Sequence, residues 1–262
     1  MSAVRAASLA IGVLFALLAA GCGGANEATS TTTSTSTTTT TPTPTKTTVR
    51  VYFLRNGQVW PVARRASATA ADAGALGELD LGPTPAEKET LGLSTSVPVP
   101  KHAVNFELAG TRRVGVVRYQ PSFPLGKLAK AQVVYTLTQF PTIKAVEIDG
   151  KRYTRTDFED QTPPILVESP LSGEKVSSPI RVTGTANTFE ATFQRELHGP
   201  RGNILSKHFE MATSGSGTRG TFAFEIPFKV LRGGTGKLVL YEDSAEDGSR
   251  IHVQEIPLEL RR

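Results

Sequence analysis

The stretch VRVYFLRNGQVWPV, residues 49–62, predicts a β-hairpin at the start of the folded part of the chain. Its first arm is rich in β-branched and aromatic residues, which favour strands. Asn56-Gly57 supplies the positive φ angles that a two-residue hairpin turn needs, and residues 59–62 form the returning strand. We expect Tyr52 and Trp60 to be buried within this hairpin. The alternative is an exposed aromatic face on which a sugar ring stacks.

Upstream of the hairpin, residues 1–21 predict a secretory signal peptide. Arg5 precedes an apolar run at residues 9–20, which is too short for a membrane-spanning helix. The run ends in Ala19-Ala20-Gly21-Cys22, which resembles the bacterial lipobox, although lipoboxes usually have Leu where this chain has Ala19. The resemblance implies a lipoprotein, held at the extracytoplasmic face of the cell membrane by lipid such as palmitate on Cys22. The alternative is an unmodified cysteine in an ordinary secretory signal.

Residues 22–48 are predicted to form a disordered tether. From residue 25 onward they are almost wholly Thr, Ser and Pro, with no side chain large and apolar enough to start a core. Such a segment spans at most roughly 80 Å when extended, and roughly 25–30 Å as a flexible coil. Glycosylation of its hydroxyls is left open.

The composition is that of a globular protein, and its 262 residues are enough for two small domains. Cys22 is the only cysteine, so neither an intramolecular disulfide nor a cysteine-based zinc site can form. The net charge of +5 comes mainly from residues 49–160, whereas positive and negative residues balance over 161–262. We interpret the basic excess as an ordinary solvated surface; the alternative is attraction to anionic envelope polymers or lipid headgroups. Nucleic acid is not expected as a partner.

Residues 49–160 are predicted to fold as an α+β domain with helices on one face of a sheet. Thr84-Pro85-Ala86-Glu87 has the spacing of a capping box, with proline at the first helical position. Apolar residues recur at helical spacing between Leu125 and Leu137. The predicted elements after the first hairpin are a helix over 66–79, a short helix to Leu91, a hairpin near 104–117, a helix after Pro124, and a strand over 143–148 with a turn at Asp149-Gly150.

Three stretches of this domain resemble the GerMN domain, a module named from a spore-germination protein. They are VYFLRNGQVWPVAR (51–64), GPTPAEKETLGLSTSVP (82–98) and QVVYTLTQFPTIKAVEIDGK (132–151). The GerMN fold is similar to ring-building modules of envelope machines. The resemblance therefore implies assembly with other proteins and no chemistry.

Residues 161–262 predict an all-β immunoglobulin-like sandwich, because short apolar runs alternate with turn residues. Without a cysteine pair, the sandwich must rely on apolar side chains for its core. The seven predicted strands are 165–167, 180–182, 191–197, 204–209, 222–228, 237–241 and 251–258, and the predicted core residues are Phe189, Phe193, Phe222, Phe224, Leu238 and Leu240.

SPLSGEKVSSPIRVTGTANTFEA (169–191), YEDSAEDGS (241–249) and the ending IPLEL (256–260) resemble the Gmad2 domain, an immunoglobulin-like partner of GerMN. Both modules in this order behind a lipid tether imply a protein of the sporulation and germination type. Phe189-Glu190-Ala191 belongs to this pattern. We expect Phe189 in the core and Glu190 at the rim; the alternative is a recognition edge.

No residue is nominated as catalytic, and no metal or cofactor site is predicted. Gly234-Thr235-Gly236-Lys237 resembles part of a phosphate-binding loop, but Leu238 and Leu231 replace required residues, so a hairpin turn is expected. His102, His198, His208 and His252 show no metal-ligand spacing. Asp243, Glu246 and Asp247 are close enough in sequence for a calcium site, but they lack the EF-hand order.

The sequence thus predicts a non-catalytic envelope lipoprotein, not an enzyme. Its expected partners are the membrane, through lipid on Cys22, and another envelope protein. The alternative is a module that binds wall polysaccharide.

Overall fold

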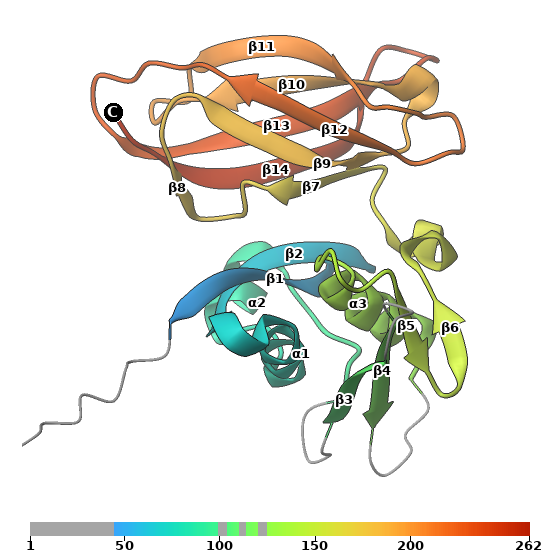
Figure 1. Ribbon diagram of the computed structural model, residues 1–262. Coiled ribbons are helices and arrows are strands. Elements are labelled where there is room, and N and C mark those ends of the chain that lie inside the picture. The colour runs from blue at the N-terminus through green and yellow to red at the C-terminus, as the bar shows by residue number, and fades with distance from the viewer. Residues whose placement is uncertain (1–44, 99–103, 110–113, 120–124) are drawn as a thin grey trace, which may run out of the picture. The chain divides into compact units, whose positions relative to one another are not determined.

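The computed structural model describes residues 45–98, 104–109, 114–119 and 125–262 (Figure 1). Thr43–Arg262 form one compact unit, which contains all of these residues. None of the described helices is both long and apolar enough to span a membrane. The predicted signal peptide, Cys22 and nearly all of the predicted tether lie outside the described residues, as does His102.

The first hairpin pairs β1 (Lys46–Arg55) with β2 (Gln58–Ser67) in antiparallel register. Asn56 and Gly57 have φ angles of 52° and 76°, so the predicted turn is confirmed. The strand includes the last three residues of the predicted tether, because the longer β2 provides pairing partners for residues 46–48. Tyr52 is fully buried and Trp60 is 5% exposed, which confirms the expected burial and contradicts the exposed sugar-stacking face.

Two helices follow the hairpin. The helix predicted over 66–79 begins later, at α1 (Ala71–Leu81), because β2 continues to Ser67 and a 3-10 turn, η1 (Ala68–Ala70), intervenes. The second, α2 (Pro85–Leu91), begins with the predicted capping box. Glu87 N donates to Thr84 Oγ1 at 3.3 Å, and Thr84 N donates to the Glu87 carboxylate at 2.8 Å.

The long predicted helix is α3 (Lys127–Leu137), and it is more buried than an amphipathic surface helix. It packs against β1, β2 and β5 (Ala145–Ile148), strands that belong to two different sheets. The expectation of helices on one sheet face was therefore wrong for α3. Even Gln132 is fully buried; its amide donates to Tyr52 O at 3.1 Å and accepts from Ser96 N at 2.8 Å.

The second sheet of this N-terminal part has the order β3-β4-β5-β6. The predicted second hairpin and the turn at Asp149-Gly150 are both present. The remaining strands are β3 (Val104–Ala109), β4 (Val114–Tyr119) and β6 (Lys151–Tyr153), and a 3-10 segment, η3 (Arg155–Gln161), leads to the next part of the chain.

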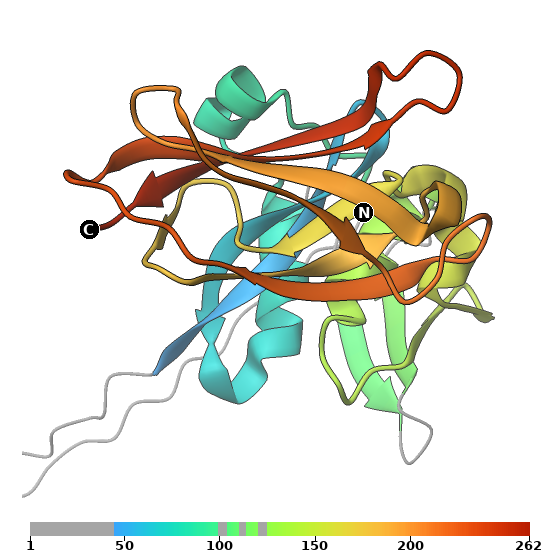
Figure 2. The same cartoon turned by 90° about the horizontal axis from the view of Figure 1, so that it is seen from above.

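Residues 165–260 form two sheets, of order β11-β10-β13-β14-β8 and β12-β9-β7 (Figures 1 and 2). All seven predicted strands are present, and prediction missed only β8, whose three residues include a single buried side chain. This strand pairs in parallel with β14, so the sheet is not wholly antiparallel. The strands are β7 (Ile165–Ser169), β8 (Glu174–Val176), β9 (Ile180–Ala186), β10 (Thr192–His198), β11 (Ile204–Met211), β12 (Gly220–Ile226), β13 (Gly234–Asp243) and β14 (Arg250–Leu260).

The core of this sandwich joins aromatic side chains from the two sheets. The rings of Phe193 on β10 and Phe222 on β12 lie 4.9 Å apart between centroids, and Phe224 packs against both. Leu238 and Leu240 are fully buried, as predicted. Phe189, however, is 61% exposed, so its assignment to the core was wrong.

Candidate functional site

Phe189 is exposed because the backbone around it turns away from the core. It opens a 3-10 turn, η4 (Phe189–Ala191), in which Glu190 and Ala191 have φ angles of 51° and 59°. Left-handed backbone in a non-glycine residue costs about 1–2 kcal/mol, and two such residues in succession are uncommon. Strain of this kind persists only where the surrounding structure imposes it, and it concentrates at functional sites.

Neighbouring backbone and side chains hold this turn on several sides. Phe189 N donates to the Glu242 carboxylate at 2.7 Å, and Glu190 N donates to Ser216 Oγ at 3.1 Å. Ala191 O accepts from Ala212 N at 2.9 Å, just after β11. The loop before β12 comes so close that a Cβ at Gly215 would lie 2.4 Å from Ala191 N. The backbone at Phe189 is therefore held in place by its surroundings.

Glu242 connects this turn to a third strained residue. Its side chain is only 11% exposed and lies 2.9 Å from His252 Nδ1, in addition to accepting from Phe189 N. His252 itself has a φ angle of 54°. Glu242 at the end of β13 thus links the backbone just before the two left-handed residues to His252.

The C-terminal end of strand β11 carries two more large exposed apolar side chains. Phe209 is 53% exposed and Met211 is 61% exposed, and they share one face of the strand because they are two residues apart. β11 is the last strand of the five-stranded sheet, so one of its edges is unpaired within the described chain. We call Phe189, Phe209 and Met211 the Phe189 surface. An edge strand with exposed apolar side chains is a typical place for another protein chain to bind.

A buried carboxylate lies on the same sheet. Glu196 has only 1% of its side chain exposed, and its oxygens contact Arg250 (2.8 Å), His198 (2.9 Å), Tyr241 (3.1 Å) and Lys207 (3.3 Å). Burial by itself raises the pKa of Glu196, but the hydrogen bonds from these partners lower it to about 2. Glu196 is therefore ionised at neutral pH and links β10 to β11, β13 and β14.

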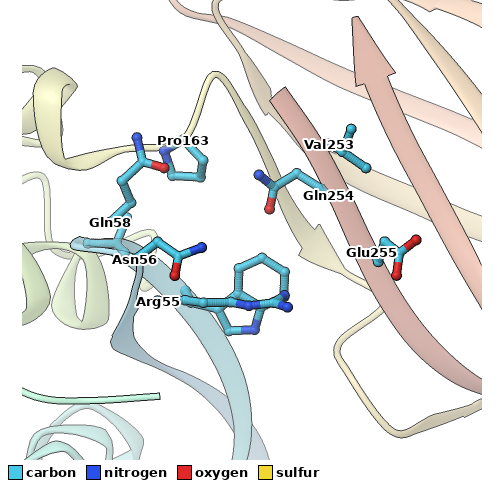
Figure 3. Close-up of a pocket in the computed structure, with 9 residues that line it drawn as sticks. Arg55, Asn56, Gln58, Pro163, Val253, Gln254 and Glu255 are labelled. Carbon is cyan, nitrogen blue, oxygen red and sulfur yellow. The ribbon is translucent and has the colours of Figure 1, made fainter. Parts of the chain in front are cut away.

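A separate pocket of about 250 Å³ lies beside the first hairpin (Figure 3). The Arg55 guanidinium lies 4.5 Å from the centre of the Trp60 ring, and the amides of Asn56, Gln58 and Gln254 contribute polar groups to the lining. Trp60 Nε1 is buried, and no hydrogen-bond partner for it is found among the described residues. The pocket thus has a largely polar lining beside a buried indole.

Three of the four histidines fall within the described residues, and their hydrogen bonds, ion pairs and ring stacking there are with residues other than histidine. His198 lies against Glu196, His252 against Glu242, and the His208 ring stacks on Phe209 at 5.0 Å.

The other sequence candidates are accounted for by local structure. Gly234-Thr235-Gly236-Lys237 lies in β13, so the expected hairpin turn was wrong. Gly236 is needed there because a Cβ would lie 2.4 Å from His198 O on the neighbouring strand. Asp243 accepts from Gln194, and Asp247 accepts from Ser249 N, which lowers the pKa of Asp247. Within the described residues, no three acidic, histidine or cysteine side chains gather as a metal site.

The comparison with known families bears on the sandwich. Residues 164–249 match Gmad2, the immunoglobulin-like domain of bacterial spore germination. The matched segment includes the Phe189 turn and β11, so the predicted Gmad2 resemblance is confirmed. A search of curated proteins found no match to the chain. The resemblance of residues 49–160 to GerMN stays a prediction.

Sequence reasoning missed the exposure of Phe189 for a physical reason. A phenylalanine before a strand is usually buried, and Glu and Ala carry no signal for left-handed backbone as Gly or Asn do. The exposure depends on Glu242, Ser216 and Ala212, which are far away in sequence.

Proposed function

We propose that this protein is a non-catalytic docking lipoprotein of the cell envelope, whose Phe189 surface binds another envelope protein. The observation that carries the proposal is the exposed Phe189 on two consecutive left-handed residues. An exposed aromatic ring gains binding energy when a partner covers it, and a backbone that is already held in place loses little conformational entropy on binding.

The unpaired edge of β11 supports a protein partner over a polysaccharide. A strand of a partner can add to this edge through main-chain hydrogen bonds, while Phe209 and Met211 contact its side chains. The aromatic residues considered for sugar stacking, Tyr52 and Trp60, are buried instead. The polar pocket beside Trp60 supports wall polysaccharide as a second candidate.

The proposed function also includes a lipid anchor at Cys22, which is supported by the sequence alone. The apolar run at 9–20 and the lipobox-like Ala19-Ala20-Gly21-Cys22 support export followed by acylation. Two or more acyl chains would anchor the protein stably, whereas one chain is marginal. Cells given labelled fatty acid should incorporate the label into the protein, and Cys22→Ala should abolish it. Label that survives in this variant would overturn the anchor.

Gmad2 in residues 164–249 supports a link to germination, and the GerMN-like stretches of residues 49–160 support a role in assembly. In this proposal the GerMN-like part also contacts envelope proteins. The sandwich carries the Phe189 surface.

Two measurements on one set of variants test protein docking against polysaccharide binding. Chemical cross-linking in cells should give discrete protein adducts that are lost in Phe189→Ser combined with Met211→Ser. The control is Leu81→Ser on α1, where an equally exposed leucine (68%) is removed. Adducts equally strong in the double variant would contradict the docking surface.

The second measurement uses purified peptidoglycan sacculi. We expect no saturable pelleting of the protein with them. Saturable pelleting that persists in the Phe189→Ser and Met211→Ser variant would favour the polysaccharide alternative instead.

A further inference from the structure

The end of the sandwich opposite Phe189 carries an open depression of about 590 Å³. The loop after β10 (199–203) and the loop between β12 and β13 (227–233) form it. The start of β13, just after the second loop, lies close to the first loop, because a Cβ at Gly234 would lie 3.1 Å from Pro200 Cβ. β10 runs from the Phe189 turn to the first of these loops, so its seven residues separate the two ends by about 20 Å.

Positive charge gathers around this depression without negative charge to balance it. Arg201, Lys229 and Arg232 all line it and are exposed, and no aspartate or glutamate is among its lining residues. None of the three makes an ion pair or hydrogen bond through its side chain with the described residues. Gly233 lies against the backbone of Arg261, so a fourth exposed cation is close to the same end.

An apolar side chain protrudes between these cations. Leu231 is 82% exposed, more than any other large apolar side chain in the described chain. Neighbouring residues anchor this loop to the sandwich, because Val230 is 9% exposed and Phe228 packs on the core. Phe228 N also donates to Ser178 Oγ at 2.9 Å. The leucine is thus presented outward from an anchored loop.

We infer that this basic tip, made of Arg201, Lys229, Leu231 and Arg232, docks on an anionic lipid surface. Cations attract phosphate-bearing headgroups, and an apolar side chain between them enters the interface, as in other proteins that bind membranes peripherally. A soluble polyanion has the same phosphates but no apolar layer for Leu231. The sequence alone pointed to the basic excess of residues 49–160, whereas the unpaired cations lie in the sandwich, whose total charge balances.

Vesicle binding tests the inference independently of acylation. The protein used begins at residue 22 and carries Cys22→Ser, which removes the apolar run and the lipid but keeps the whole compact unit. It should sediment with vesicles that contain phosphatidylglycerol and not with pure phosphatidylcholine. Replacing Arg201, Lys229 and Arg232 by Gln should weaken this binding roughly 100-fold, since each cation near an anionic membrane strengthens binding about five-fold. Leu231→Ser should weaken it about tenfold.

Matched control variants distinguish the basic tip from exposed cations and exposed apolar side chains elsewhere on the protein. Gln at Lys88, Lys144 and Arg152, three exposed cations outside the sandwich, and Ser at Leu81 should leave vesicle binding unchanged. All replaced side chains are exposed, so thermal melts should agree among the variants.

Three outcomes would overturn the inference. They are absence of binding to the anionic vesicles, equal loss in the control variants, and binding to soluble polyphosphate as tight as to vesicles and unaffected by Leu231→Ser. The last outcome would identify a soluble polyanion as the ligand.

Discussion

Phe189 and Phe193 are four residues apart, yet one is 61% exposed and the other 2% exposed. The difference arises from the backbone, since the left-handed residues 190 and 191 reverse the chain between them. The two rings should therefore respond oppositely to removal. Phe193→Ala should lower the free energy of unfolding by about 3–5 kcal/mol.

Phe189→Ala should change it by no more than about 0.5 kcal/mol. Urea unfolding of both variants measures the difference. A large loss of stability for Phe189→Ala would place this ring in a structural role and weaken the docking proposal.

Part of the protein's stability depends on pH through Glu196. Its pKa is lowered from 4.5 to about 2 in the folded protein, so its contribution is fully present above pH 4.5 and is lost as the pH falls toward 2. Lys207 and Arg250 are half exposed, which limits this contribution to about 1–2 kcal/mol. Thermal melts of Glu196→Gln and wild type should converge between pH 4.5 and 2. A constant difference across this range would contradict the assignment.

Elements whose structure depends on residues close together in the sequence could be predicted. Features that depend on contacts between residues far apart in the sequence could not. The Asn56-Gly57 turn and the α2 capping box depend on side chains within four residues, and both were predicted correctly. β8 was missed because its main-chain bonds to β14 involve residues more than 80 positions away. The burial of Gln132 on α3 likewise depends on Tyr52 and Ser96.

The capping box gives a prediction for one element. Thr84→Ala removes the hydroxyl that accepts from Glu87 N, so the free energy of unfolding should fall by about 1 kcal/mol. Thr84→Ser keeps the acceptor and serves as the control in the same denaturant titration. Equal losses for Ala and Ser would show that the hydroxyl is not what stabilises α2.

For the whole compact unit, a partly buried cluster ties the first hairpin and η3 to β7. Arg155 Nη1 donates to the Glu168 carboxylate at 2.8 Å, and Tyr52 OH donates to the same carboxylate. The Arg155 guanidinium also lies 4.6 Å from the centre of the Tyr135 ring. Burial by itself raises the pKa of Glu168, but Arg155 and Tyr52 lower it overall. Glu168 is thus a paired carboxylate whose charged form is stabilised by Arg155.

Arg155→Ala should leave Glu168 without its cation and lower the free energy of unfolding by about 2–4 kcal/mol. The matched control is Lys237→Ala. It breaks the 2.7 Å ion pair with Glu255, in which both side chains are over 40% exposed, and should cost less than about 1 kcal/mol. Similar losses for both variants in denaturant titrations would contradict a special role for the buried pair.

The sandwich has a basic tip at one end of β10 and the Phe189 surface at the other. If the tip rests on lipid, the opposite end is free to meet a partner away from the bilayer.

A photo-activated cross-linker placed in living cells at residue 189, and in separate strains at residues 211 and 81, tests protein docking most directly. The account predicts the same discrete protein adduct from positions 189 and 211 and none from position 81. Adducts that are absent at 189 and 211, or equally abundant at 81, would contradict it.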